Sequence, residues 1–139
     1  MSELVMNNKK EPVLRNASYR FAVRIVKLSQ YLQKEKKEFV LNKQILRSGT
    51  AIGALICEAK FAQSDADFIN KLSISLKEAN ETAYWLSLLK DTDYINEKLC
   101  NSLSSDCNNL VSMLISSVNT MKKKLHATKK SKARHPSNL

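Results

Sequence analysis

Proline and glycine are almost absent from this sequence. Among its 139 residues only Pro12 and Pro136 are proline, and only Gly49 and Gly53 are glycine. A β-rich fold needs turn residues about every 8–12 positions, and the stretch between the two prolines lacks them. Aromatic residues make up only 6% of the chain, whereas 43% of its residues are hydrophobic. These absences exclude a β fold and predict an all-α protein with an aliphatic core.

Cysteine and histidine are too few, and too unfavourably spaced, for a disulfide framework or a metal site. Cys57, Cys100 and Cys107 are odd in number and form no Cys-x-x-Cys pair. Cys100 and Cys107 would lie about 10 Å apart along one helix, which is too far for a disulfide. We expect all three to be small buried hydrophobic residues in a reducing cytosol. His126 and His135 lie in a basic C-terminal region, so no metal and no cofactor are expected.

Long apolar runs are also missing. No stretch of about 18 apolar residues occurs, and the N-terminal residues lack the apolar centre of a signal peptide. We therefore expect a soluble cytoplasmic protein with no membrane partner.

Positive charge, in contrast, is abundant and collects at the two ends of the chain. The net charge is +10, divided into +7 over residues 1–47, −4 over 48–120 and +7 over 121–139. Basic segments bind phosphate backbones without reading sequence, although many only aid solubility. The candidate phosphate ligands are Arg15, Arg20, Arg24, Lys27, Lys34, Lys122, Lys123, Lys124, Lys129, Lys130, Lys132 and Arg134.

Hydrophobic periodicity predicts four amphipathic helices joined by short connections, which is typical of an up-down-up-down four-helix bundle. The first covers about 13–36 and the second about 42–62, with Asn42 as its N-cap. The third begins at Ser64, where Asp67 completes a capping-box pattern. The apolar faces comprise Phe21, Ile25, Leu28, Leu32; Ile45, Ile52, Ile56, Ala59; Phe68, Leu72, Leu76, Ala79, Ala83, Leu86; and Leu99, Leu103, Cys107, Leu110, Leu114, Val118, Met121, Leu125.

The apolar pattern stops at Leu125, which sets the expected domain limits. Residues 1–12 are predicted to be a flexible N-terminal segment and 13–125 the bundle. Residues 126–139 are rich in lysine and lack periodicity, so a disordered basic tail is expected there.

The two glycines lie inside the second predicted helix, where glycine costs about 1 kcal/mol relative to alanine. Gly49, Gly53 and Cys57 recur at intervals of four and form a strip of small residues. Such a strip lets another helix approach closely, and we expect it to serve as a packing or subunit interface. A phosphate-binding loop is disfavoured because no strand precedes the glycines and neither nucleotide-loop motif is present.

Several carboxylates are candidates for a site, but a structural role is favoured. No Glu-x-x-His pair and no nucleophile–histidine set can be assembled from the helices, so an enzyme is not expected. Arg47, Glu58, Glu78 and Glu81 are instead expected to form a partly buried ionic network within or between bundles. Trp85, the only tryptophan, is expected in the core or at a subunit interface.

The stretch from Leu41 to Thr92 resembles the four-helix-bundle family of 23S ribosomal RNA intervening-sequence proteins. It has the Arg-Ser entry at Arg47, the small-residue helix and the Glu-Ala step. It then has the "S-x-x-D-F" start at Ser64 and the "K-E-x-x-E-T-x-Y-W-L" helix from Lys77. Together these pieces make a specific match.

The resemblance implies an assembly and, more loosely, a function. Members of known structure form a homopentameric ring of up-down bundles. The family also includes the accessory variability determinant of diversity-generating retroelements, a basic protein that partners a reverse transcriptase. With the charge segregation, this favours a non-enzymatic oligomer that binds structured RNA or an RNA–DNA hybrid, as an accessory to such a polymerase. The alternative is a structural protein–protein interaction module with no nucleic-acid role.

Overall fold

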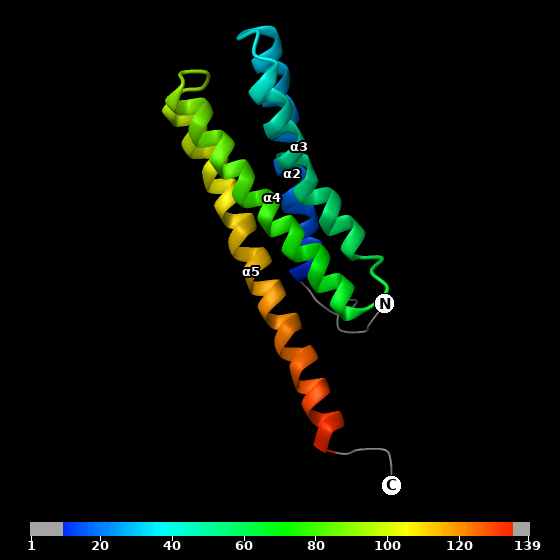
Figure 1. Cartoon of the computed structure of the whole chain (residues 1–139). Helices are drawn as coiled ribbons and strands as arrows, with labels where there is room; N and C mark the ends of the chain where they lie inside the picture. The colour runs from blue at the N-terminus through cyan, green and yellow to red at the C-terminus, as the bar shows by residue number, and fades with distance from the viewer. Residues whose placement is uncertain (1–9, 135–139) are drawn as a thin grey trace.

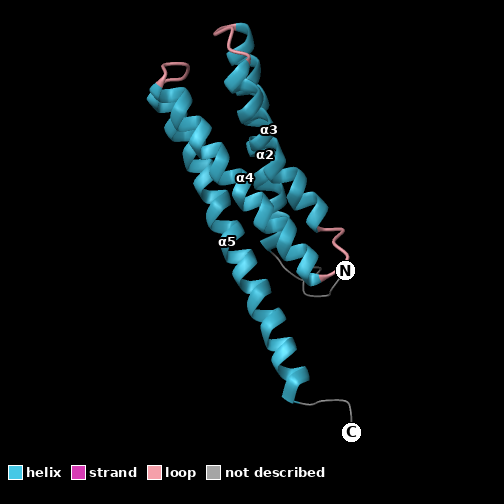
Figure 2. Ribbon diagram, in the orientation of Figure 1, coloured by secondary structure: helices cyan, strands magenta, loops and turns pink. Residues whose placement is uncertain are grey.

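The chain forms four α-helices and no strand over residues 10–134, which a computed structural model describes, with side chains from 12 to 131. The helices run alternately up and down, and the last extends well beyond the other three (Figure 1, Figure 2). Each helix packs against its neighbours in the chain, and α2 and α5 close the arrangement. The predicted all-α class and the four helices are therefore confirmed.

Helix α2 spans Lys10–Lys34, a little earlier at both ends than its periodicity predicts. Pro12 falls in its first turn, where a missing N–H costs nothing. The expected flexible segment therefore ends sooner, and its residues 1–9 lie outside the described part. Lys37, in the middle of the connection that follows α2, adopts a left-handed backbone with φ of 53°.

Helix α3 spans Val40–Ala59, and the prediction of Asn42 as its N-cap is wrong. Asn42 lies inside the first turn and is buried, and its backbone N–H donates to Oε1 of Glu38 at 2.9 Å. A carboxylate placed before the helix thus replaces the expected amide cap. The helix also ends three residues earlier than the predicted boundary at residue 62.

Helix α4 spans Asp65–Asp91, and its predicted start is confirmed. The N-cap Ser64 accepts a hydrogen bond from the backbone N–H of Asp67 at 3.0 Å. The Asp67 carboxylate accepts in turn from the N–H of Gln63 at 3.2 Å, one residue before the usual capping-box partner. Asp93, with φ of 66°, marks the turn that follows the helix.

Helix α5 spans Glu97–Arg134, and the Asn96 side chain caps it by accepting from the N–H of Leu99 at 2.8 Å. The prediction of a disordered tail from residue 126 is wrong for 126–134, which continue the helix. Residues 135–139 lie outside the described part. Burial does stop after Leu125, but lysine and alanine favour helix and no glycine or proline interrupts them. The sequence pattern therefore marked where packing ends and not where the helix ends.

The core lies between all four helices and contains every residue of the predicted apolar faces. Leu76, Ala83, Leu99 and Leu125 are half-buried against it, and the others are buried. The largest fully buried side chains are Phe21, Ile25, Leu32, Ile45, Ile52, Leu72, Leu86, Leu89, Leu103, Leu110, Leu114 and Met121.

The strip of small residues lets α2 approach α3 closely within one bundle. A Cβ added at Gly49 would lie 2.8 Å from Cγ1 of Ile25, closer than two carbon atoms can normally come. A Cβ at Gly53 would lie 3.2 Å from Oγ of Ser18, which is a tight contact. Gly49 therefore gives room to a buried isoleucine of α2, and this packing offsets the poor helix propensity of glycine.

Candidate functional site

The side of α2 that faces α5 carries four basic residues and one tyrosine. Arg20, Arg24, Lys27, Tyr31 and Lys34 recur at intervals of four, three, four and three, which places them along one side of the helix. Four of the five line hollows between α2 and α5, and Lys34 is exposed beyond them. The sequence thus predicted the charges of this flank, but not that they border a groove.

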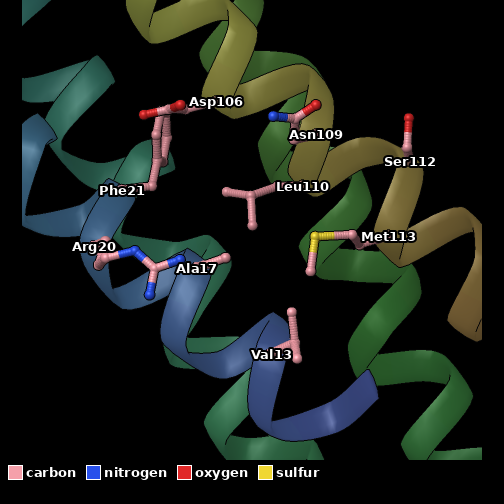
Figure 3. Close-up of a pocket in the computed structure, with 9 residues that line it drawn as sticks. All are labelled: Val13, Ala17, Arg20, Phe21, Asp106, Asn109, Leu110, Ser112 and Met113. Carbon is pink, nitrogen blue, oxygen red and sulfur yellow. The ribbon is translucent and has the colours of Figure 1, made fainter. Parts of the chain in front are cut away.

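Two hollows follow one another along the line where α2 meets α5, and we call them together the α2–α5 groove. The first has a volume of about 480 Å³, and Figure 3 shows Leu110 and Met113 of α5 pointing toward α2 across it. The second is smaller, about 220 Å³. The first is lined by Val13, Ala17, Arg20, Phe21, Asp106, Asn109, Leu110, Ser112 and Met113. The second is lined by Arg24, Lys27, Leu28, Tyr31, Leu99 and Leu103.

An ion pair joins the two helices where the hollows meet. Nη1 of Arg24 lies 2.7 Å from Oδ2 of Asp106, and Nη2 donates to Oγ of Ser102 at 2.9 Å. Arg24 therefore already has a carboxylate partner, whereas no ion pair is found for Arg20 or Lys27 among the described residues. Asp106 could not be identified from sequence, because its partner Arg24 lies 82 positions away in the chain.

A second basic surface lies on the C-terminal part of α5, from Lys122 onward. Lys122, Lys123, Lys124, Lys129 and Lys130 are all exposed, and within the described residues none is paired with a carboxylate. We call these five residues the distal α5 lysines. Lys132 and Arg134 belong to the last turn of the same helix. The charges that the sequence assigned to a flexible tail are thus carried on a helical rod.

Arg15 does not share a surface with the other candidate phosphate ligands of α2. It lines a separate hollow of about 240 Å³ between α2 and α3, together with Tyr19, Gly53 and Cys57. Its Nε is buried and finds no hydrogen-bond partner among the residues that the structure describes. Arg15 thus lies on the opposite flank of α2, away from Arg20 and Lys27.

The polar residues predicted to form an ionic network meet between α3 and α4, with one exception. Nη1 of Arg47 lies 2.8 Å from Oε2 of Glu78, and Nη2 forms a very short contact with Oε2 of Glu81. The same oxygen of Glu81 accepts from Nε1 of Trp85 at 2.9 Å. Glu58 lies outside this group, because it is exposed and has no ion-pair partner in the described part of the chain.

These contacts shift the ionisation of two groups in the network. The indole N–H of Trp85, with smaller help from Arg47, lowers the pKa of Glu81. The hydrogen bonds that Arg47 donates to Glu81 and Glu78 raise the pKa of Arg47. The Arg47 side chain remains 51% exposed, so the network lies at the surface of the bundle. Its contribution to the free energy of unfolding is therefore modest.

Beneath the ionic network, buried hydroxyl groups join α3 to α4. Ser75 Oγ donates to the carbonyl oxygen of Ile52 at 2.9 Å, and Thr82 Oγ1 donates to Oγ of Ser48 at 3.0 Å. These two contacts were not predicted from the sequence. The serine and threonine residues at core positions of both helices could have indicated them. The contacts among the residues from Arg47 to Trp85 therefore help to fix how α3 and α4 pack, and the carboxylates of Glu78 and Glu81 are already engaged.

The cysteines differ in burial more than the sequence predicted. Cys100 and Cys107 are buried, but Cys57 is exposed, so the expectation that all three are buried is wrong. Cys57 lies at the C-terminal end of the glycine strip and lines the open hollow between α2 and α3. Burial raises the pKa of Cys107 to about 11, and the thiol donates to the carbonyl oxygen of Ala79 at 3.2 Å. Cys107 is therefore an inert core residue.

Two features that the described residues lack bear on the class of site. No group of three or more His, Cys, Asp or Glu side chains in residues 10–134 is arranged to hold a metal ion. None of the four helices, as far as they are described, is both long and apolar enough to cross a membrane.

Comparison with known proteins relates the fold to a family. The family model described as 23S rRNA-intervening sequence protein matches residues 11–116. The chain is also similar to a crystal structure at 1.70 Å resolution, a protein of unknown function from the S23 ribosomal protein family of Bacteroides thetaiotaomicron. The two are 55% identical with a TM-score of 0.78, over 79% of this chain and 98% of the other. No curated protein matches. The family match ends before the distal α5 lysines.

Proposed function

The chain belongs to the 23S rRNA-intervening sequence protein family, and we propose that it is a non-enzymatic, oligomeric protein that binds structured RNA or an RNA–DNA hybrid. The single observation that carries this proposal is the helical rod at the end of α5. Its distal lysines are exposed and unpaired with carboxylates in the described residues. Charges fixed on a helix lose less conformational freedom on binding than charges on a flexible tail. A phosphate backbone is the partner whose charge density suits them.

The α2 flank adds a second contact in this proposal. Arg20, Lys27 and Lys34 are exposed on one side of the helix and have no ion pair in the described part. Arg24 contributes less, because Asp106 already neutralises it. No reading motif is present, so binding is electrostatic and weakly selective for sequence.

The proposed assembly is a homopentameric ring that serves as an accessory subunit of a reverse transcriptase. Its support is the resemblance carried by residues 41–92, together with apolar side chains exposed on the α2 and α3 side. Tyr19 is 69% exposed, and Val23 and Val26 are also exposed on the same flank of α2. A contact between copies would remove this apolar surface from water.

The same apolar surface supports a second candidate, a protein–protein interaction module with no nucleic-acid role. In that case the lysines of α5 only aid solubility. The two candidates differ in how binding affinity depends on salt concentration, because only phosphate contacts release counterions from a nucleic acid.

A salt series of binding isotherms on structured RNA, duplex DNA and a hybrid tests the proposal. Each phosphate contact contributes about 0.7–0.9 to the slope of log affinity against log salt. Truncation after Leu125 should reduce this slope, and replacing Arg20, Lys27 and Lys34 with alanine should reduce it further. A matched triple variant, Lys43, Lys71 and Lys77 to alanine on α3 and α4, removes the same charge and should keep most of the slope.

Folding of each variant is checked by circular dichroism before binding is measured. Absence of binding by the full-length chain to all three nucleic acids at low salt would overturn the proposal. Equal losses in the matched triple variant would show that net charge alone matters, and that the two surfaces are not binding sites.

A further inference from the structure

The α2–α5 groove has an apolar floor that nucleic-acid binding does not use. Phe21 and Leu110 form its buried base, while Val13 is 58% exposed at one end and Tyr31 is exposed at the other. Figure 3 shows Val13, Leu110 and Met113 around one open space between the two helices. A phosphate backbone would pair with the basic residues of the rim and leave this apolar surface in water.

The groove also has the dimensions of a helix. Along α2 its lining runs from Val13 to Tyr31, which at 1.5 Å per residue is about 27 Å, or five helical turns. A compact pocket for a small molecule is a single cavity, whereas here two open hollows lie in line. An amphipathic helix can place its apolar stripe along such a floor, with side chains repeating every three to four residues.

The charge of the groove rim indicates which side chains a bound helix would carry. Arg20, Arg24 and Lys27 border the groove, and Asp106 is the only carboxylate among the described residues that line it. The rim is therefore net positive, and the Arg24–Asp106 pair in the middle can exchange its carboxylate for one from a partner. Carboxylates beside the apolar stripe of the bound helix would complement this rim.

We propose that the α2–α5 groove binds an amphipathic helix of a partner protein, whose apolar stripe is flanked by aspartate or glutamate. The contact combines burial of Val13, Met113 and Tyr31 with pairing to Arg20 and Lys27. It goes beyond the proposed function, since it does not require nucleic acid or the distal α5 lysines.

A synthetic helical peptide of about 18 residues serves as the probe, with leucine on one stripe and glutamate on both flanks. Two control peptides accompany it, one with lysine in place of glutamate and one with the same composition in scrambled order. Binding to the full chain is measured by fluorescence anisotropy. The glutamate peptide is expected to bind with micromolar affinity, and each control at least about tenfold more weakly.

Two variants locate the binding, each with a matched control elsewhere. Val13→Glu places a carboxylate on the floor and should weaken the peptide at least about tenfold. Val40→Glu, at a 72% exposed valine on α3, should not. Arg20→Glu with Lys27→Glu should weaken it similarly, whereas Lys43→Glu with Lys77→Glu, the same charge change on α3 and α4, should change it little.

The results separate this proposal from the nucleic-acid one. Truncation after Leu125 should leave peptide affinity unchanged even if RNA binding falls. The proposal is overturned if the glutamate peptide does not bind, or if the two members of each variant pair weaken it equally. RNA binding that depends on Arg20 and Lys27, without any peptide binding, would make the rim a phosphate site and would also overturn it.

Discussion

Gly49 and Gly53 lie on the same strip of α3 but meet α2 under different constraints. Alanine at either position gains about 1 kcal/mol of helix propensity. At Gly49 the new Cβ would press on Cγ1 and Cγ2 of Ile25, a buried branched side chain that cannot turn away, at a cost of about 1–3 kcal/mol. At Gly53 it would lie 3.2 Å from Oγ of Ser18, a milder contact that a small shift of the serine relieves.

We therefore expect Gly49→Ala to lower the free energy of unfolding by about 1 kcal/mol, and Gly53→Ala to leave it unchanged or raise it slightly. Urea denaturation of the two variants beside the parent protein measures this difference. Equal stability of the two variants would mean that α2 does not lie as close to Gly49 as the structure places it.

The hydrogen bond from Trp85 to Glu81 makes stability depend on acid pH. Because the folded pKa of Glu81 is lowered, its ionised form stabilises the fold above the unfolded value of about 4.3. This contribution is lost as pH falls through the lower folded pKa. Trp85→Phe removes the N–H donor, so the gap in Tm between the parent and the variant should be widest near neutral pH and narrow in acid.

Thermal melts between about pH 7 and pH 3 test this expectation. The smaller phenylalanine also loses some packing, which lowers Tm by a similar amount at every pH and leaves the trend intact. Tyr84→Phe is the control, because Tyr84 is exposed, contacts the Trp85 ring edge-on and donates nothing to Glu81. A gap for Trp85→Phe that is constant with pH would contradict the assignment.

At the scale of elements, α5 has two parts with different reasons to be helical. Up to Leu125 the helix is held by burial against its neighbours, and beyond Leu125 it depends on its own propensity. Ala127 lies in the exposed part. Ala127→Pro should therefore remove helical signal from the end of α5 and leave the melting of the bundle unchanged.

Circular dichroism at low temperature measures the lost helicity, and a thermal melt measures the bundle. The variant keeps every lysine, so it also tests whether the helical structure of this segment contributes to nucleic-acid binding. Weaker binding with an unchanged salt slope would be the effect of lost rigidity. A large drop in Tm would show that residues beyond Leu125 support the bundle, contrary to their exposure.

At the scale of the whole molecule, the α2 and α3 side carries the exposed apolar surface that an assembly would bury. Tyr19→Glu with Val26→Glu should convert the proposed oligomer, of five times 15.8 kDa, to a monomer of unchanged helicity. Tyr84→Glu on α4 alters another exposed aromatic residue and should not. Light scattering measures the mass. A parent chain that is monomeric at micromolar concentrations would remove the ring from the proposed function.

The helical class, the number of helices and nearly all of the core could be predicted from the amino-acid sequence. Those properties depend on local periodicity, in which apolar residues repeat within one helix whatever its neighbours do. Ser64 was found for the same reason, since a cap and its partner are three residues apart. The basic ends of the chain were likewise evident from composition.

Which polar groups meet depends on how the helices pack, and it could not be predicted from the sequence. The rotation and register of packed helices join Arg24 to Asp106 and Arg47 to Glu78, and neither pairing follows from any one helix. The same packing exposes Cys57, buries Asn42 and separates Arg15 from Arg20. The α2–α5 groove belongs to this class too, because the shape between two helices depends on both of them at once.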